Sequence, residues 1–458
     1  MIRYRVLVPI CVRVACAMLA FTYCTCDFVP TNARAIVPEF RAPRDTIRIG
    51  ILSKYAPRAI DVYTRDARLF INGQTIVVGA SGAGTHPVRV SVALYDSANL
   101  RVRISEQPTI DVTADSYILD SPEMYEIQLP DANGRRRYTG RLTVTARNGA
   151  ILAATTLDLE TYVLATARAE LGPVLAGLSA ASRKNLTEAM QAVVRSYALA
   201  YTSRHAGADD FDFDLCDLTH CMHFPGLDDL AVPDAPRLAM VLQAPENARQ
   251  LAPADFVPAY FHSTCGGRLA GPESYWSPEP APGSAGVTSH RNDAPRPNLA
   301  GIYRVGVDAL INDGNDGSGE NEALCGASPH FRWQATVHAA QIRKIFVVRN
   351  PVRLRAADLL RRDGRVVLIS YENELSIPAH EFISRAGRVL GWNVIKSNDF
   401  TVDSTGDALR FRGRGLGHGV GLCQWGAREL ARRGKSAADI LKFYYPGATI
   451  VALTEAAP

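Results

Sequence analysis

The sequence predicts an α+β protein in which a β-rich N-terminal part precedes a mixed α and β domain. Three observations support this fold class. Residues 46–145 alternate in the manner of strands between glycine-rich turns, and two amphipathic helices follow at 158–171 and 186–203. The chain then ends in a strand, a glycine-rich turn and a third helix at 424–433. With 458 residues, 47% of them apolar, the chain can bury a sizeable core.

The β-rich part is predicted from apolar residues that alternate, or nearly alternate, with polar ones. Residues 46–51 (TIRIGI) and 88–94 (VRVSVAL) each predict a strand with one buried face. The glycine-rich segment 79–84 predicts a turn. The run of predicted strands ends with residues 141–145.

The first predicted helix covers residues 158–171. Apolar residues recur on one of its faces, and Asp158 and Glu160 lie in the first turn, where negative charge is favourable. Gly172 and Pro173 predict its end.

The second predicted helix covers residues 186–203, with Asn185 or Thr187 as its cap. Two later segments, 272–297 and 312–319, are rich in Pro, Gly, Ser, Asn or Asp. Such compositions predict loops or parts of a lid.

The N-terminal residues predict a secretory signal peptide. Arg3 and Arg5 form a basic start, residues 14–21 are apolar, and a small-x-small pattern ends at Ala35, where cleavage is expected. We therefore expect an exported protein of the periplasm or cell envelope.

The sequence also bears on two possible partners, a membrane and nucleic acid. A lipid anchor on Cys24 or Cys26 is the alternative interpretation of the leader, and it would be the membrane contact. No later stretch is long and apolar enough to span a bilayer. The net charge of +4 comes with no cluster of basic and aromatic residues, so nucleic acid is not expected as a partner.

The cysteines divide between the leader and the mature chain. Four of the nine lie in the leader, and an exported protein can form disulfides. The odd number that remains requires at least one thiol to be free or bound to a metal. The remaining residues are Cys216, Cys221, Cys265, Cys325 and Cys423.

Glu170 is the candidate catalytic residue. It closes the first predicted helix, where a carboxylate meets the negative end of the helix dipole. That position and burial in a cleft would both raise its pKa, as a general acid for glycosidic cleavage requires. The alternative is a solvated surface glutamate.

Gln191 and Arg195 are candidate ligand-binding residues on the second helix. They stand four residues apart on one face, so both can point at one site. The alternative is an ordinary amphipathic helix without a ligand.

A cluster of His and Cys residues predicts a metal site after the second helix. Two Cys and three His lie within nineteen residues, and zinc binds these side chains in a tetrahedron. The spacing matches no standard zinc finger, and a local disulfide or free thiols are the alternatives. The five residues are His205, Cys216, His220, Cys221 and His223.

Two further segments carry polar and aromatic groups. His262 and Ser263 are neighbours, and neighbours in a strand point to opposite faces, so a polar cleft wall is favoured over a nucleophile and base. In the glycine-rich block 411–427, His418, Gln424 and Trp425 offer polar and stacking groups suited to sugars. The alternatives there are a phosphate-binding loop, which would need a different spacing, and a tight structural turn.

Taken together, these segments resemble the SpoIID/LytB family, which contains sporulation stage II protein D and amidase-enhancer proteins. The resemblance covers roughly residues 150–450, in family order. Together with the leader and the strand pattern, it divides the chain into a signal peptide at 1–35, a β-rich region at 36–150 and a SpoIID/LytB-like domain at 151–458. The matching segments are 157–163, 169–170, 191–197, 216–221, 261–267, 325–329, 415–427 and 444–447.

The resemblance implies a lytic transglycosylase that cleaves peptidoglycan glycan strands stripped of stem peptides, with Glu170 as its acid. Amidase-enhancer members instead bind glycan and stimulate a partner cell-wall amidase without cutting, which is the alternative function. A zinc-dependent hydrolase is disfavoured because no His-Glu-x-x-His helix is present. The residues expected to line a glycan-binding cleft are Gln191, Arg195, Tyr197, His262, Ser263, His418, Gln424 and Trp425.

The resemblance also implies zinc on Cys216, His220 and Cys221, with His205 or His223 completing the site. Cys423 stands where the family usually has Ser. If Cys216 and Cys221 bind the metal and Cys423 is held in the glycine-rich block, two cysteines of the mature chain remain. We expect these two, Cys265 and Cys325, to form a disulfide that adds about 4 kcal/mol to stability.

Overall fold

The chain divides into two units, residues 1–39 and residues 40–458. The predicted leader and most of both predicted loop segments lie outside the described residues. Among the described residues, no helix is long and apolar enough to cross a membrane. The computed structural model describes residues 45–79, 86–105, 110–128, 134–201, 213–218, 221–227, 239–244, 256–276, 301–308, 323–346, 359–362, 365–370, 373–405 and 408–453.

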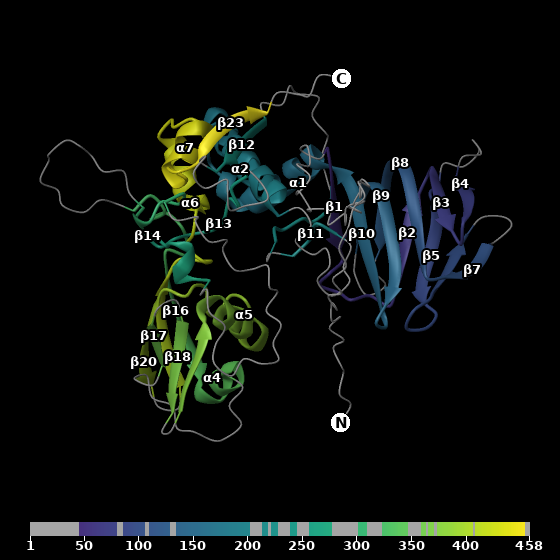
Figure 1. Ribbon diagram of the computed structural model, residues 1–458. Helices are drawn as coiled ribbons and strands as arrows, with labels where there is room; N and C mark the ends of the chain where they lie inside the picture. The colour runs from purple at the N-terminus through teal and green to yellow at the C-terminus, as the bar shows by residue number, and fades with distance from the viewer. Residues whose placement is uncertain are drawn as a thin grey trace, which may run out of the picture. The chain divides into compact units, whose positions relative to one another are not determined.

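A large, mostly antiparallel sheet contains eleven of the described strands, with β8 and β9 among its longest (Figure 1). The order along its main path is β11-β1-β10-β9-β8-β2-β5-β6-β7, and β3 and β4 form a hairpin on β8. The strands predicted at 46–51 and 88–94 are confirmed as β1 and β5. The bounds are β1 Thr46–Ile51, β2 Ala59–Thr64, β3 Ala67–Ile71, β4 Gln74–Val78, β5 Val88–Leu94, β6 Leu100–Ile104, β7 Ile110–Ala114, β8 Ser116–Gln128, β9 Arg135–Arg147, β10 Ala150–Asp158 and β11 Leu215–Cys216.

Helix α1 (Leu159–Leu171) confirms the first helix prediction. It follows β10 directly, and the carboxylate of its N-cap, Asp158, accepts a hydrogen bond from Thr161 N at 2.8 Å. Since β10 begins at Ala150 and pairs with both β1 and β9, the expected domain boundary at 150/151 falls at the start of a strand of the large sheet.

Helix α2 (Ala180–Ala200) begins six residues before the predicted start. Its N-cap is Ser179, whose hydroxyl accepts from Ser182 N, so the prediction of Asn185 or Thr187 as the cap was wrong. No glycine or proline separates Ala180 from Leu186, so nothing stops the helix from starting at the earlier cap. Asn185 instead donates to Lys435 O at 3.0 Å.

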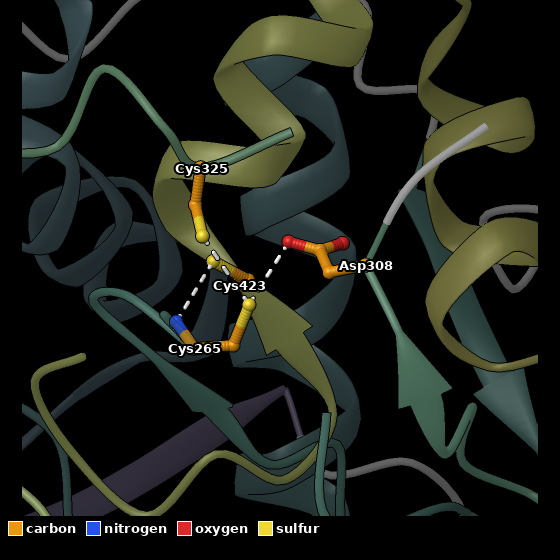
Figure 2. Close-up of side chains that lie close together, drawn as sticks. All are labelled: Cys265, Asp308, Cys325 and Cys423. Atoms are coloured by element: carbon orange, nitrogen blue, oxygen red, sulfur yellow. Dashed lines mark hydrogen bonds between the residues drawn. The ribbon is translucent and has the colours of Figure 1, made fainter. Parts of the chain in front are cut away.

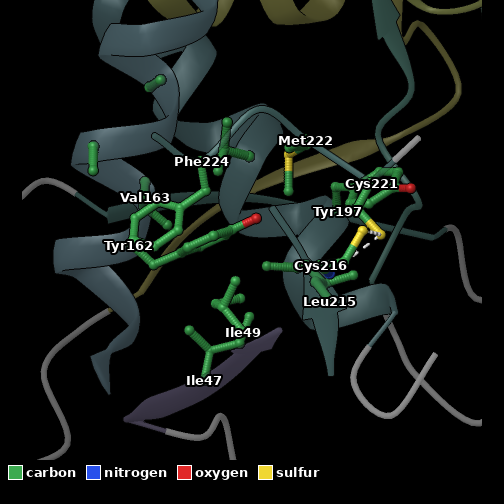
Figure 3. Close-up of a cluster of buried hydrophobic side chains, with 14 of the residues drawn as sticks. Ile47, Ile49, Tyr162, Val163, Tyr197, Leu215, Cys216, Cys221, Met222 and Phe224 are labelled. Atoms are coloured by element: carbon green, nitrogen blue, oxygen red, sulfur yellow. Dashed lines mark hydrogen bonds between the residues drawn. The ribbon is translucent and has the colours of Figure 1, made fainter. Parts of the chain in front are cut away.

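Helix α2 packs against α1, strand β12 and the two C-terminal helices α6 and α7. A single cluster of buried side chains runs from Ile47 in the large sheet to Tyr445, and Figure 3 shows the part around Tyr162 and Phe224. The predicted C-terminal helix is confirmed as α6. The bounds are η1 Gly172–Leu175, β12 Ala239–Gln243, β13 Phe261–His262, β14 Arg268–Leu269, η2 Pro272–Ser274, β15 Gly306–Val307, β22 Leu422–Cys423, α6 Gln424–Arg432, α7 Ala437–Tyr444 and β23 Thr449–Leu453.

A second core lies within residues 332–414, which we call the insertion. Its first and last strands pair antiparallel, with Arg332 opposite Arg414, and its buried residues form a cluster separate from the main core. The sequence analysis did not separate this segment from the rest. Its elements are β16 Arg332–His338, α4 Ala339–Phe346, β17 Leu359–Arg362, β18 Arg365–Ser370, β19 Asn373–Pro378, α5 Ala379–Leu390, β20 Phe400–Thr405 and β21 Ala408–Arg414.

Candidate functional site

Glu170 lies in the last turn of α1 and is half-buried. The backbone N–H of His223 donates to Glu170 Oε1 at 2.7 Å. Gln424 Nε2 donates to the backbone carbonyl of Glu170 at 3.0 Å, so the N-terminus of α6 holds the end of α1. Burial raises the pKa of the Glu170 carboxyl, and the His223 N–H opposes this in part. The arrangement favours a carboxyl group that keeps its proton to a higher pH than an exposed glutamate does.

The raised pKa of Glu170 predicts a specific pH dependence of stability. Between the unfolded-state pKa of about 4.3 and the higher folded-state pKa, the folded chain binds more protons than the unfolded chain, so stability falls as pH rises through this window. Glu170→Gln cannot titrate and should remove that part of the fall. Unfolding curves of both proteins across the window measure the difference between them. Parallel curves for wild type and variant would show that Glu170 has an ordinary pKa.

The polar side chain of Gln424 is buried at the start of α6, next to the parallel pair β13–β22. Trp425 N donates to Ser263 O at 3.2 Å, which ties α6 to the end of β13. Glu170, Gln424, Trp425 and Ser263 are therefore linked by consecutive contacts. The structure brings these four predicted residues together.

Glycines in the block 411–427 allow close backbone contacts around His262. An added Cβ at Gly421 would lie 1.9 Å from Tyr260 O, and one at Gly417 would lie 2.9 Å from His262 Cβ. Both glycines also have positive φ, 72° and 106°. The glycines thus let the block pack directly against β13.

His262 and His418 form a pair with ring centroids 5.5 Å apart. Burial lowers the pKa of His262 to about 4, and burial together with the neighbouring His262 lowers the pKa of His418 to about 3. Both imidazoles are therefore neutral at physiological pH. His262 Nδ1 lies 3.1 Å from Val420 O, and rings of Tyr260, Tyr275 and Trp276 surround His418.

A pocket of about 350 Å³ lies beside His418. Thr264, Ser397, Asn398 and Arg414 are among its lining residues, and Glu170 is not among them. The pocket thus combines residues of the glycine-rich block with residues of the insertion.

The sequence analysis expected Arg195 to face a ligand, but the structure places its side chain in the interior. Its side chain is 3% exposed and forms a two-pronged ion pair with Glu160, at 2.6 and 2.5 Å. It also donates to Met240 O at 2.8 Å. These contacts occupy the guanidinium, which therefore ties α2 to α1 and β12.

Tyr197 is likewise an internal residue. It is 4% exposed, and its ring contacts those of Tyr201 and Tyr260. Gln191, one turn before Arg195, is half-buried. The sequence analysis placed Glu160 in the first turn of the first helix but did not connect it with Arg195.

Three of the five predicted metal ligands, Cys216, Cys221 and His223, lie within the described residues. Cys216 and Cys221 are buried in the main core and point toward each other (Figure 3). Their sulfurs lie 3.5 Å apart. His205 and His220 lie outside the described residues. His223 is exposed, and no group of three metal-binding side chains in the described ranges contains it. His223 contributes its backbone N–H to Glu170 instead.

Cys265 and Cys325, the predicted disulfide pair, are also brought together, with their sulfurs 3.4 Å apart. Two residues that the sequence analysis did not connect with them, Cys423 and Asp308, complete a buried group of four (Figure 2). The one available signal was Cys423, which stands where the resembled family usually has Ser.

Comparisons with known proteins identify similar chains. An uncharacterized protein of Brachyspira hyodysenteriae is 24% identical over 317 residues, which cover 69% of this chain and 72% of that protein. The amidase enhancer of Bacillus subtilis is 40% identical over 76 residues, 17% of this chain and 10% of the enhancer. Stage II sporulation protein D of B. subtilis is 45% identical over 56 residues, 12% of this chain and 16% of that protein.

No model of a known protein family matches the chain. The two B. subtilis similarities are local, and each spans less than a fifth of the relative's length. They support a domain in this chain that is similar to stage II sporulation protein D and the amidase enhancer.

Proposed function

We propose that this chain is an exported lytic transglycosylase that cleaves peptide-stripped glycan strands of peptidoglycan. The supporting observation is Glu170, a half-buried carboxyl group with a raised pKa that two segments distant in sequence hold in place. The local similarity to stage II sporulation protein D supports a role at the cell wall. The predicted leader supports export to the periplasm or cell envelope.

In the proposed reaction, Glu170 donates its proton to the glycosidic oxygen as the bond to the anomeric carbon breaks. An oxocarbenium-like state forms on the sugar, as in other glycosidic cleavages. A hydroxyl group of the same sugar attacks the anomeric carbon and closes an anhydro ring, and its proton goes to the Glu170 carboxylate. One residue thus acts first as acid and then as base, and no second carboxylate is needed to activate water.

The alternative is a glycan-binding enhancer of a cell-wall amidase, which the similarity to the B. subtilis amidase enhancer favours. Incubation with peptide-free glycan strands distinguishes the two functions. Anhydro-sugar ends detected by mass spectrometry support the enzyme. Binding to these strands without cleavage, combined with faster release of stem peptides from intact peptidoglycan by an added amidase, supports the enhancer.

We also propose that zinc binds Cys216, His220 and Cys221, with His205 as fourth ligand. The two buried sulfurs, 3.5 Å apart, fit neighbouring ligands of one tetrahedral ion. When bound, zinc would supply a structural cross-link. The cysteines would hold it from the segment that also carries His223, whose N–H contacts Glu170.

Cys221→Ser should lower the melting temperature of the full chain and remove about one equivalent of zinc, because a closed four-ligand site loses its metal with one ligand. Elemental analysis and thermal unfolding measure both effects. His86→Ser, which removes an exposed histidine of the mature chain that belongs to no proposed metal site, is the matched control and should change neither. A Cys216–Cys221 disulfide in a peptide map without reductant would contradict the proposal.

A further inference from the structure

Four side chains form a buried group at the base of α6 (Figure 2). Cys265 Sγ lies 3.4 Å from Cys325 Sγ and 3.0 Å from Asp308 Oδ2. One ligand atom from each of Cys265, Asp308, Cys325 and Cys423 can be chosen so that all four lie within 4.8 Å of one another. The four residues come from separate parts of the chain, which only the fold brings together.

The spacing of these atoms suits ligands of one small metal ion. Sulfurs at about 2.3 Å from a tetrahedral zinc ion lie about 3.8 Å apart, whereas disulfide-bonded sulfurs lie about 2.05 Å apart. A disulfide between Cys265 and Cys325 would also use only two of the three thiols. Cys423 and Asp308 would then remain buried beside it.

Asp308 gives an independent reason to expect a cation. The residue has no measurable exposure, and its carboxylate oxygens contact Tyr444 Oη at 3.1 Å and Cys265 Sγ at 3.0 Å. In the ranges that the structure describes, no Lys or Arg forms an ion pair with Asp308. A buried carboxylate is costly unless it is paired or coordinates a metal. A metal ion held by the three sulfurs would compensate it.

Backbone hydrogen bonds position Cys423 for this role. Its sulfur accepts from Cys265 N at 3.3 Å and from Gly426 N at 3.4 Å. Groups that orient ligand atoms in this way are common around metal ions. Next to it, an added Cβ at Gly426 would lie 2.8 Å from Asp308 Oδ2, so a side chain there would crowd the carboxylate.

We propose that Cys265, Asp308, Cys325 and Cys423 bind one structural zinc ion. This assignment replaces the expected Cys265–Cys325 disulfide and is separate from the zinc proposed at Cys216 and Cys221. Three thiolates select zinc over calcium or magnesium, and the carboxylate makes copper(I) a poorer match. The ion would join the segment after β13, the segment after β15, the turn at Cys325 and the start of α6.

Zinc content of the full chain, exported and purified without chelator, tests the proposal. Cys423→Ser and Asp308→Asn should each remove about one equivalent of zinc, as expected for a closed four-ligand site. Cys216→Ser is the matched control and should leave this equivalent in place, whether or not it removes another. Loss of zinc from the Cys216 site can therefore be distinguished from loss of zinc from the site proposed here. Unchanged zinc content in Cys423→Ser would overturn the proposal.

A measurement on the wild-type chain covers the case in which a variant does not fold. Denaturation with chelator but without reductant should release zinc and leave all three thiols open to alkylation. A linked Cys265–Cys325 peptide in the digest would overturn the proposal. Three free thiols without any released zinc would overturn it too.

Discussion

Replacing Glu170 with Gln is expected to reduce cleavage of peptide-free glycan strands by about 10²–10⁴-fold, the usual contribution of a general acid or base. The amide keeps the shape of the side chain and can still accept the hydrogen bond from His223 N, but it cannot donate the proton that the leaving oxygen needs. Anhydro-sugar ends quantified by mass spectrometry measure the rate. Binding to the same strands should be preserved, because the loss concerns the reaction step.

Glu188→Gln is the matched control for that variant. Glu188 is a partly exposed residue of α2, 3.9 Å from Lys184, and its replacement removes one carboxylate without touching the contacts of Glu170. It should leave the cleavage rate unchanged. Full activity in Glu170→Gln would refute the assignment of Glu170 as the acid, and a wild-type chain that binds but does not cleave would favour the enhancer function.

Arg195→Met is expected to lower the free energy of unfolding by about 3–5 kcal/mol, because it leaves a partly buried carboxylate without its partner. The guanidinium contacts both carboxylate oxygens of Glu160 and the carbonyl of Met240. Methionine fills similar space but makes none of these bonds. Urea unfolding of the purified variant measures the change.

Two further variants separate the buried ion pair from a general effect of removing arginine. Arg141→Met removes an exposed ion pair with Asp120 and should leave stability nearly unchanged. Glu160→Gln combined with Arg195→Met should cost less than the sum of the single changes, since the two side chains are partners. Strict additivity would mean that the two residues stabilise the fold independently.

Local patterns predicted the elements that strong local signals define. The alternation at 46–51 and 88–94 and the apolar face of 158–171 lead to the observed β1, β5 and α1. The start of α2 was missed because Ser179 precedes a stretch with little apolar periodicity. The insertion was missed because its short strands depend on pairing between residues distant in sequence, such as Arg332 with Arg414.

The candidate site shows the same division. Glu170, Gln424 and Ser263 could be singled out from motifs, and the structure links them through α6. Arginine is a residue type often found in binding sites, which made Arg195 a candidate. Sequence spacing could not show that its guanidinium is already paired with the carboxylate of Glu160. Asp308 stood in no motif, and only its burial beside three sulfurs identifies it.

The paired ends of the insertion have an evolutionary consequence. Because β16 and β21 are neighbours, the chain leaves the main core and returns to it at adjacent points. Such segments tolerate changes in length, since their ends stay fixed. Ser397 and Asn398 of the insertion line the pocket beside His418, whereas Glu170 is held by the main core. Substitutions or length changes in the insertion can therefore alter the lining of this pocket while the contacts that hold Glu170 stay the same, so the two parts of the molecule can change at different rates.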